Sequence, residues 1–473
     1  MPNGLDSVYR RSTTALAALA LVGALVAGCS GGGATEPSAP PPPPIIPTSS
    51  TGSPATSAQP AGPAADWPTY HHDNARTGVA ADLAPVGPLR QAWRANLDGA
   101  VYGQPLLVGG LLLAATENDT VYALDPATGT VRWHIHVGTP QPQSGLPCGD
   151  IDPLGITGTM AYDQATGRVF AVAETVGGGH TLYGFDVRTG QVSVRVGVEP
   201  PKGDKLAHQQ RSALTVLDGR VYVAYGGLEG DCAQYIGSVV SVTTDGAQPL
   251  SYAIPTTREA GIWAPGGAVV SQGDLLYSAG NGESTSRYDG SDSVIALSPQ
   301  LRRVDLFAPS TWPEDNANDL DLGSSSPVVL GPWVFVAGKR GIGYTLRADH
   351  LGGVGGQVGQ ADICKSFGGA AVQGDTAYLP CTDGPRSLTI GAAGRPTVGW
   401  HATVQASGAP TLGGGAVWVA DWDTGTLYAL DQRTGSVRQR IDVGELPHFA
   451  TPTLGGSAVY LGTLHGVVAV AGA

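Results

Sequence analysis

Apolar and polar positions alternate along this chain in one short, recurring pattern. Residues 120–133, TVYALDPATGTVRW, alternate at period two, turn at Asp125-Pro126 and Gly129, and continue into a second run that contains Trp133. This is the pattern of a β-hairpin whose turn needs a positive φ at the glycine. Residues 181–194 and 426–439 repeat it clearly, and residues 238–251 and 293–306 repeat it in degenerate form. Copies of one hairpin spread over most of a chain predict a repeat architecture.

The repeats predict a closed ring of small sheets. Each repeat opens with a short inner strand, continues through a glycine-rich turn into an apolar strand, and ends in the hairpin. The last repeat, residues 448–473, lacks a fourth strand, which the segment LRQAWRANL at residues 89–97 can supply. Joining the two chain ends removes exposed sheet edges. We therefore predict an all-β, eight-bladed β-propeller over residues 66–473, with seven blades as the alternative because the fifth and sixth repeats are degenerate.

The N-terminal segment predicts export and lipid anchoring. Residues 1–29 combine Arg10 and Arg11 with an apolar run and end in LVAGC, the pattern of a lipoprotein signal peptide with a lipobox at Cys29. Residues 30–65 are rich in Pro, Ser, Gly and Ala, a composition that builds no core and forms a tether. The pattern predicts an extracytoplasmic lipoprotein anchored to the cell membrane.

Composition narrows the possible partners and fixes the expected state of the cysteines. The chain carries 26 Lys and Arg against 39 Asp and Glu, a net charge of -13 that argues against nucleic acid. Four cysteines remain beyond Cys29, an even number that favours disulfides outside the cytoplasm, with three possible pairings. We predict Cys364–Cys381 and Cys148–Cys232. The chain has no CxxC or CxxCH spacing that would indicate zinc or covalent haem.

These motifs resemble a known repeat family. The phrase VYALDPATGTVRW, the Ala/Thr-Pro openings of the repeats and the lead-in WPTYHHDNARTG at residues 67–78 are similar to the PQQ-like β-propeller repeats. Such repeats occur in quinoprotein alcohol dehydrogenases and in BamB-like envelope scaffold lipoproteins. The resemblance covers the chain after the tether and implies the fold more firmly than the function, because this propeller serves enzymes and binding proteins alike.

The dehydrogenase side of the resemblance implies a set of site residues. Trp263 would stack under the quinone, and Lys339 would contact it. Glu174 and Asn281 would bind Ca²⁺, which takes oxygen ligands, and Asp319 or Asp321 would act as general base. Each residue also has a structural interpretation: Trp263 as packing between blades, Asn281 as a left-handed turn residue, the aspartates as turn caps, and Lys339 as part of an exposed hairpin tip.

Other features weaken the dehydrogenase hypothesis. The adjacent Cys-Cys pair that covers the second face of the quinone in these enzymes has no counterpart here, and no haem motif follows. We therefore favour a monomeric, non-catalytic lipoprotein whose propeller binds envelope proteins or a small ligand, with an apolar rim patch that could include Trp312, Trp333, Trp418 or Trp422. The alternative is a PQQ- and Ca²⁺-dependent alcohol or polyol dehydrogenase. A Ser hydrolase is disfavoured because residues 66–473 contain no GxSxG motif.

Overall fold

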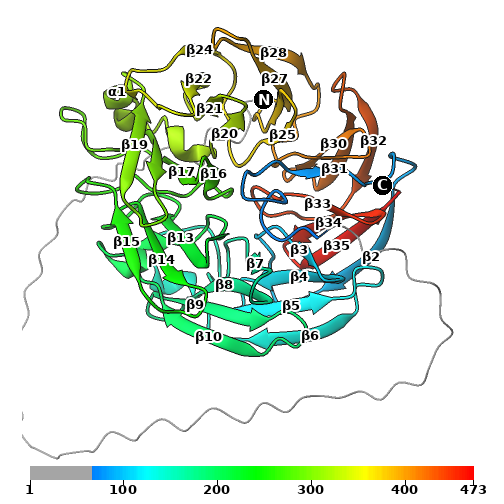
Figure 1. Cartoon of the computed structure of the whole chain (residues 1–473). Helices are drawn as coiled ribbons and strands as arrows, with labels where there is room; N and C mark the ends of the chain where they lie inside the picture. Colours follow the sequence, from blue (N-terminus) through cyan, green and yellow to red (C-terminus); the bar gives the residue numbers. More distant parts are fainter. Residues whose placement is uncertain (1–65, 473) are drawn as a thin grey trace, which may run out of the picture. The chain divides into compact units, whose positions relative to one another are not determined.

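Eight sheets, antiparallel apart from the added strands β1 and β23, form a ring in the computed structural model, which describes residues 66–472 (Figure 1). Blade 1 comprises β3 (Leu106–Val108), β4 (Leu111–Thr116), β5 (Thr120–Leu124) and β6 (Val131–His136). Blade 2 comprises β7 (Ala161–Asp163), β8 (Arg168–Thr175), β9 (Gly179–Asp186) and β10 (Val192–Gly197). Blade 3 comprises β11 (His208–Gln209), β12 (Thr215–Leu217), β13 (Arg220–Gly227), β14 (Ser238–Thr243) and β15 (Leu250–Ala253). Blade 4 comprises β16 (Val269–Ser271), β17 (Asp274–Ala279), β18 (Ser293–Leu297), β19 (Arg303–Ala308) and β23 (Gly353–Val354).

The second half of the ring repeats the same order. Blade 5 comprises β20 (Val328–Leu330), β21 (Trp333–Ala337), β22 (Ile342–Arg347) and β24 (Gly359–Asp362). Blade 6 comprises β25 (Ala371–Gln373), β26 (Thr376–Leu379), β27 (Arg386–Ile390) and β28 (Pro396–His401). Blade 7 comprises β1 (Val79–Ala80), β29 (Thr411–Gly413), β30 (Ala416–Asp421), β31 (Thr426–Asp431) and β32 (Val437–Asp442). Blade 8 comprises β33 (Thr453–Gly455), β34 (Ala458–Thr463), β35 (Gly466–Ala471) and β2 (Arg90–Asn96).

The ring closes as the sequence predicts. β2 pairs antiparallel with β35, the last strand, and places Arg94 opposite Val468. The eight-bladed count is therefore confirmed over the seven-bladed alternative. Helical structure in the described residues is limited to α1 (Trp312–Ala317) and the 3₁₀ turns η1 (Gln143–Gly145), η2 (Lys205–Ala207) and η3 (Leu322–Ser324). Within residues 66–472, no helix is long and apolar enough to cross a membrane.

At three junctions of the ring, a tryptophan of one blade packs on the turn glycine of the next. Trp133 at the end of the blade 1 motif donates its indole N–H to the Val187 carbonyl in the blade 2 turn, at 3.1 Å. The indole ring of Trp133 lies on Gly190, which has a φ of +73° and no side chain to obstruct the contact. Trp93 repeats this contact on the blade 1 turn through Pro126, and Trp400 repeats it on the blade 7 turn through Gln432. The motif therefore pairs a tryptophan with the turn glycine of the following blade.

The lead-in segment, residues 67–78, crosses the axis of the ring. Its backbone or side chains form hydrogen bonds with the innermost strands, or the residues directly before them, in blades 1, 2, 3, 4, 6 and 7. Arg76 is buried and donates to the carbonyls of Tyr70, Leu214 and Ala268. Burial lowers the pKa of its guanidinium to about 10. The lead-in is thus a central plug that ties the inner strands together.

Both predicted disulfides are present. Cys148 and Cys232 join the loop after blade 1 to the β13–β14 connection in blade 3, and Cys364 and Cys381 join blades 5 and 6. The predicted signal peptide, the tether and the lipidation site Cys29 lie outside the described residues.

The tryptophan-on-glycine contact can be tested with two glycines that share one backbone conformation. Gly190 and Gly219 both have a φ of +73°, but a Cβ at Gly190 would lie 2.8 Å from the Trp133 ring, whereas nothing lies within 4 Å at Gly219. We expect Gly219→Ala to cost about 1 kcal/mol of backbone strain. Gly190→Ala should cost about 2–4 kcal/mol because it adds overpacking. Urea unfolding measures both variants, and equal losses would contradict the contact's role.

Candidate functional site

One position of the repeat lies at the same axial end of every blade. In blade 1 the second strand ends at Thr116, which pairs with Thr120, and the next residue is Glu117. We call the equivalent residue of each blade the axial position. The strand registers place there Glu117, Glu174, Gly226, Gly280, Lys339, Pro380, Trp422 and Leu464 in blades 1 to 8. Three of the residues predicted from the sequence, Glu174, Lys339 and Asn281, are therefore at or next to one repeated position.

In blades 1 and 2 the axial carboxylate reaches forward to the next blade. Glu117 accepts hydrogen bonds from the Gly155 amide at 2.8 Å and from the Thr157 hydroxyl at 3.1 Å. Glu174 accepts a hydrogen bond from the Gln210 amide at 2.5 Å. Burial raises the pKa of Glu117 to about 8 despite these donors. The two carboxylates therefore act as latches between neighbouring blades.

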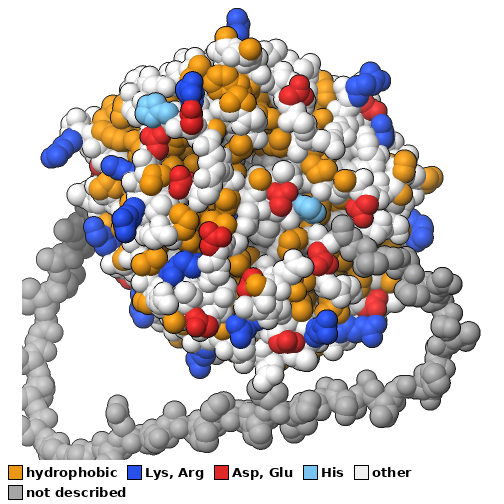
Figure 2. Space-filling model, viewed as in Figure 1, with side chains coloured by type: hydrophobic (Ala, Val, Ile, Leu, Met, Phe, Trp, Pro, Cys, Tyr) orange, Lys and Arg blue, Asp and Glu red, His pale blue; other side chains and the backbone are white. Residues whose placement is uncertain are grey.

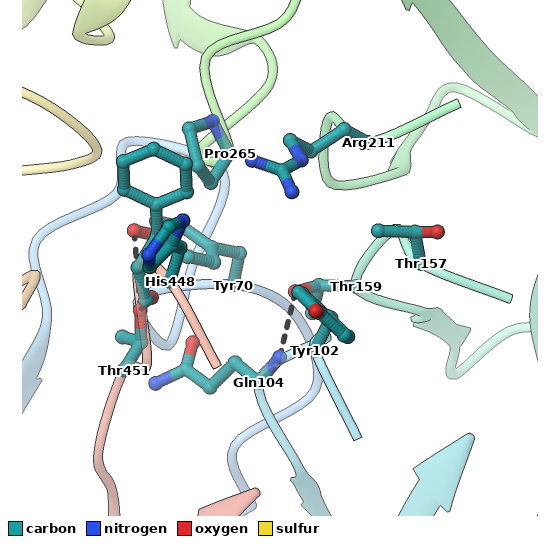
Figure 3. Close-up of a pocket in the computed structure, with 10 residues that line it drawn as sticks. Tyr70, Tyr102, Gln104, Thr157, Thr159, Arg211, Pro265, His448 and Thr451 are labelled. Carbon is teal, nitrogen blue, oxygen red and sulfur yellow. Dashed lines mark hydrogen bonds between the residues drawn. The ribbon is translucent and has the colours of Figure 1, made fainter. Parts of the chain in front are cut away.

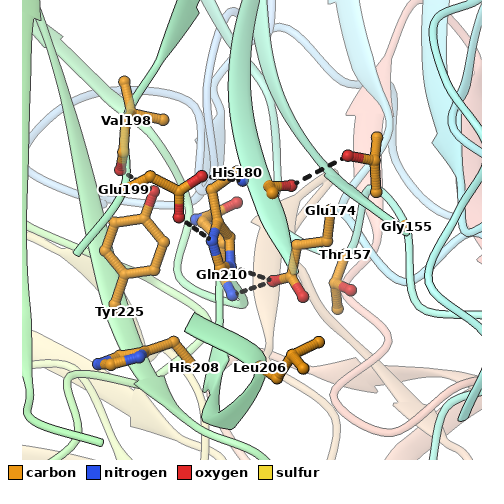
Figure 4. Close-up of polar contacts among 12 residues, drawn as sticks. Gly155, Thr157, Glu174, His180, Val198, Glu199, Leu206, His208, Gln210 and Tyr225 are labelled. Atoms are coloured by element: carbon orange, nitrogen blue, oxygen red, sulfur yellow. Dashed lines mark hydrogen bonds and ion pairs between the residues drawn. The ribbon is translucent and has the colours of Figure 1, made fainter. Parts of the chain in front are cut away.

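Glu174 also belongs to an ion-pair chain that runs through the buried His180 to the exposed Glu199 (Figure 4). The His180 ring lies between the Glu174 carboxylate, at 3.4 Å, and the Glu199 carboxylate, at 3.1 Å. Burial alone would lower the pKa of His180, but the two carboxylates outweigh it and raise the pKa to about 9. Glu174 is therefore committed to His180 and Gln210.

In blades 3 and 4 the axial position is glycine, which leaves room for a side chain from the following blade. A Cβ at Gly226 would lie 2.6 Å from the Trp263 Cβ, and a Cβ at Gly280 would collide with the Asp321 carboxylate. Trp263 and Asp321 thus enter the axial end because the preceding blade has no side chain there.

Lys339 gathers the carboxylates of this half of the ring. Its ammonium lies 2.7 Å from Asp319 and 2.8 Å from Asp321, and 5.7 Å from the centre of the Trp263 ring. Burial opposes its charge, but Asp321 and Asp319 raise the pKa of Lys339 above its usual value. Burial and the Asp321 charge raise the pKa of Asp319 to about 6. The other carboxylate oxygen of Asp321 accepts a hydrogen bond from the backbone N–H of Asn281 at 2.5 Å.

The structure brings together most of the predicted site residues. Trp263, Asn281, Asp319, Asp321 and Lys339 form one cluster, which we call the Lys339 cluster. Glu174 forms its described contacts with His180 and Gln210 instead.

Two structural interpretations of these residues are wrong. Asn281 is absent from the positive-φ residues, so it is not a left-handed turn residue. Lys339 is 8% exposed, so it does not lie at a solvated hairpin tip.

The contacts of the Lys339 cluster decide whether a quinone and a calcium ion could bind there. Residues 66–472 contain no group of three or more His, Cys, Asp or Glu side chains placed to hold a metal ion. The Asp321 carboxylate is already shared between Lys339 and the Asn281 amide. Phe367 and Phe449 pack against Trp263, with ring centres 6.3 and 6.1 Å away, and Lys339 lies over the indole. As arranged, these residues do not fit a stacked quinone beside a calcium ion.

Figure 3 shows a narrow pocket, and Phe449 of its lining also packs against Trp263. It is lined by Tyr70, Tyr102, Gln104, Thr157, Thr159, Arg211, Pro265, His448, Phe449 and Thr451. The open volume is about 10 Å³, the lower limit for a single water. The Arg211 guanidinium lies 5.1 Å from the Phe449 ring centre, a cation–π distance that closes this side of the pocket.

The predicted tryptophan patch on the rim is wrong. Trp418 is fully buried, and its indole N–H donates to the Gly413 carbonyl at 3.1 Å. Trp312 and Trp422 are also buried, and Trp333 is half-buried. On the face shown in Figure 2, acidic, basic and hydrophobic side chains are interspersed. Trp418 serves packing, because β30 is buried along its whole length and buries its largest side chain there.

The sequence reasoning missed Glu117 and Asp292. Glu117 stands in TENDTVYAL where Glu174 stands in ETVGGGHTLYGF, so aligning the repeats on their third strands would have found it. Asp292 is fully buried and accepts the Leu322 amide hydrogen at 3.0 Å. Burial and Asp321 raise the pKa of Asp292 well above its usual range. No local motif marks Asp292, because its neighbours come from the following blade.

The comparisons agree with the propeller and divide on function. A family model described as outer membrane protein assembly factor BamB matches residues 89–293. The dehydrogenase subunit of the quinone-type alcohol dehydrogenase of Gluconobacter oxydans is 27% identical over 38% of this chain and 24% of its own length. The polyvinylalcohol dehydrogenase of Sphingopyxis sp. is 25% identical over 56% of this chain and 43% of its own length. The chain thus spans less than half the length of these relatives.

Solved structures share the fold at low identity. A quinohemoprotein alcohol dehydrogenase of Pseudomonas putida superposes with a TM-score of 0.66 and 13% identity, covering 86% of this chain and 80% of the other. BamB of Moraxella catarrhalis superposes with a TM-score of 0.55 and 16% identity, covering 81% of this chain and 99% of the other. The resemblance to PQQ-like propeller proteins is confirmed.

The buried Glu117 latch predicts a pH dependence of stability. The folded-state pKa of about 8 lies above the usual glutamate pKa of 4.5. Protonation therefore favours the folded state, and this contribution is complete below about pH 4.5 and lost as the pH rises through about 8. Glu117→Gln keeps an acceptor for the Gly155 amide and removes the charge. We expect it to flatten the fall in unfolding free energy over this range, by up to about 1.4 kcal/mol per pH unit.

Denaturant unfolding at stepped pH values measures that slope. The exposed residue Asp82 supplies the control, Asp82→Asn, which should leave the slope unchanged. A Glu117→Gln variant with the wild-type slope would show that the carboxylate is charged in the folded protein throughout.

Proposed function

We propose that this protein is a non-catalytic, extracytoplasmic lipoprotein, anchored through Cys29, whose propeller acts as a monomeric binding module for envelope proteins or a small ligand. The observation that carries the proposal is the internal use of the axial side chains. Lys339 is paired with Asp319 and Asp321, and Glu174 with His180 and Gln210. A buried charge that is already paired would have to lose its partner before it could bind a metal or a substrate.

Two further features support this proposal. The two disulfides are typical of proteins that work outside the cytoplasm. The match to the BamB description covers blade-forming residues 89–293, and propeller rims offer rigid surfaces built from loops. Because Trp312, Trp418 and Trp422 are buried, the binding surface is built from polar loop residues rather than from a tryptophan patch.

The second candidate function is a PQQ- and Ca²⁺-dependent alcohol or polyol dehydrogenase. One observation favours it: Trp263, Asn281, Lys339 and the aspartate pair converge although they come from different repeats. The named relatives in Gluconobacter and Sphingopyxis are dehydrogenases. This candidate function requires the Lys339–Asp321 ion pair to break, so that both side chains can contact a bound ligand instead.

A calorimetric titration of residues 66–473 with PQQ and Ca²⁺ separates the two functions. We expect no binding heat for either ligand, alone or together, because Lys339, Asp319, Asp321 and Glu174 are paired within the protein. Calcium-dependent PQQ binding that is lost in Asn281→Ala and retained in Asn118→Ala, an amide outside the cluster that bonds Asp98, would overturn it in favour of the dehydrogenase. Dye-linked oxidation of alcohols would then be assayed on the wild-type protein.

A further inference from the structure

The outer strands carry a histidine or an arginine at one repeated position in four consecutive blades. In blade 1, His134 of β6 pairs with Tyr122 of the hairpin motif. The equivalent residues are Arg195 opposite Tyr183 in blade 2, Arg440 opposite Tyr428 in blade 7 and Arg94 opposite Val468 in blade 8. All four side chains are exposed. We call Arg440, Arg94, His134 and Arg195 the cationic arc.

The other half of the ring has no charge at this position. There the registers place Ser251, Leu306, Gln360 and Val398 in blades 3 to 6. Blades 7, 8, 1 and 2 are consecutive around the closed ring, and Figure 1 shows their outer strands β32, β2, β6 and β10 following one another along one side. Folding therefore concentrates on one side cations that lie far apart in a sequence with a net charge of -13.

Neutral groups hold the side chains of the cationic arc, and no neighbouring carboxylate among the described residues pairs with them. The Arg195 guanidinium lies 5.8 Å from the Tyr183 ring centre, and the His134 ring stacks on Tyr122 at 5.4 Å. Arg94 donates to the Val443 carbonyl at 2.8 Å. Within residues 66–472 none of the four forms an ion pair, whereas the nearby Arg132 and Arg438 are paired with the turn carboxylates Asp125 and Asp431.

Exposed valines accompany the cations. Val131, Val192 and Val437 open β6, β10 and β32, three residues before His134, Arg195 and Arg440, and are 41%, 38% and 43% exposed. A register shift between each valine and its cation lets both side chains face outward. Alternating apolar and cationic side chains along one exposed edge are the combination that binds the interface of an anionic bilayer.

We propose that the cationic arc is a docking surface for anionic phospholipid headgroups, which lays one side of the propeller against the membrane. A lipid surface fits because arginines and exposed valines lie together on this outer edge. The edge curves with the ring, so a flat bilayer first meets the two middle blades, 8 and 1, which carry Arg94 and His134. This orientation leaves blades 3 to 6 turned away from the bilayer and accessible to other proteins. The proposal depends on neither candidate function.

Vesicle sedimentation tests the surface. Residues 66–473 contain every strand of the ring, so this part serves as wild type and carries no lipid anchor. It should bind vesicles that contain phosphatidylglycerol and not vesicles of phosphatidylcholine alone, and added salt should release it. The triple variant Arg94→Ser, Arg195→Ser, Arg440→Ser should bind about 100-fold more weakly, from about 1 kcal/mol for each arginine.

A matched triple variant removes the same charge elsewhere. Arg287→Ser, Arg302→Ser and Arg395→Ser change exposed arginines in blades 4 and 6 and should retain vesicle binding. Equal losses in the two triple variants, or wild-type protein that ignores the anionic lipid, would overturn the proposal. Wild-type binding to soluble polyglutamate but to neither vesicle would also overturn it, and would indicate an acidic protein as the partner.

Discussion

The closing ladder between β2 and β35 is the constraint on which the ring depends. A propeller blade buries its faces only against neighbours, so a gap at one junction would expose apolar strands on both sides of it. β2 fills the outer edge of blade 8, and Trp93 from the same strand packs on the turn of blade 1. The lead-in then crosses the axis and bonds the inner strands of blades on opposite sides. The chain ends therefore hold the circle at its rim and at its axis.

Because the ring closes, equivalent residues of all eight repeats come together at one end of the propeller axis. Each blade places one residue at the axial position, and the chemistry of the axis follows from how these residues differ. Glutamates in blades 1 and 2 bond forward to the next blade, while glycines in blades 3 and 4 admit Trp263 and Asp321. Lys339 in blade 5 meets the aspartates that blade 4's glycine has admitted. The same mapping on the outer strands gathers Arg94, Arg195 and Arg440 on one side.

The fold could be predicted from the sequence because its signals are local. Period-two alternation, the turn glycine and the repeated tryptophan define hairpins, and the missing strand of the last repeat requires β2. The convergence of Trp263, Asn281 and Lys339 was accessible through the resemblance. The contacts that these residues make could not be predicted from the sequence. The pairing of Lys339 with two aspartates depends on which side chains the neighbouring blade leaves room for. The rim tryptophans were misjudged for a related reason: a strand's buried face is set by the adjacent blade, which the sequence of the strand does not contain.

Lys339, Asp319 and Asp321 neutralise one another at the axis. A crystal structure of residues 66–473 grown with PQQ and Ca²⁺ would test this pairing. We predict that the Lys339 ammonium remains between Asp319 and Asp321 and that no ion lies between Glu174 and Asn281. An ion held by Glu174 and Asn281, with Lys339 withdrawn from Asp321 and a flat ligand on Trp263, would contradict it.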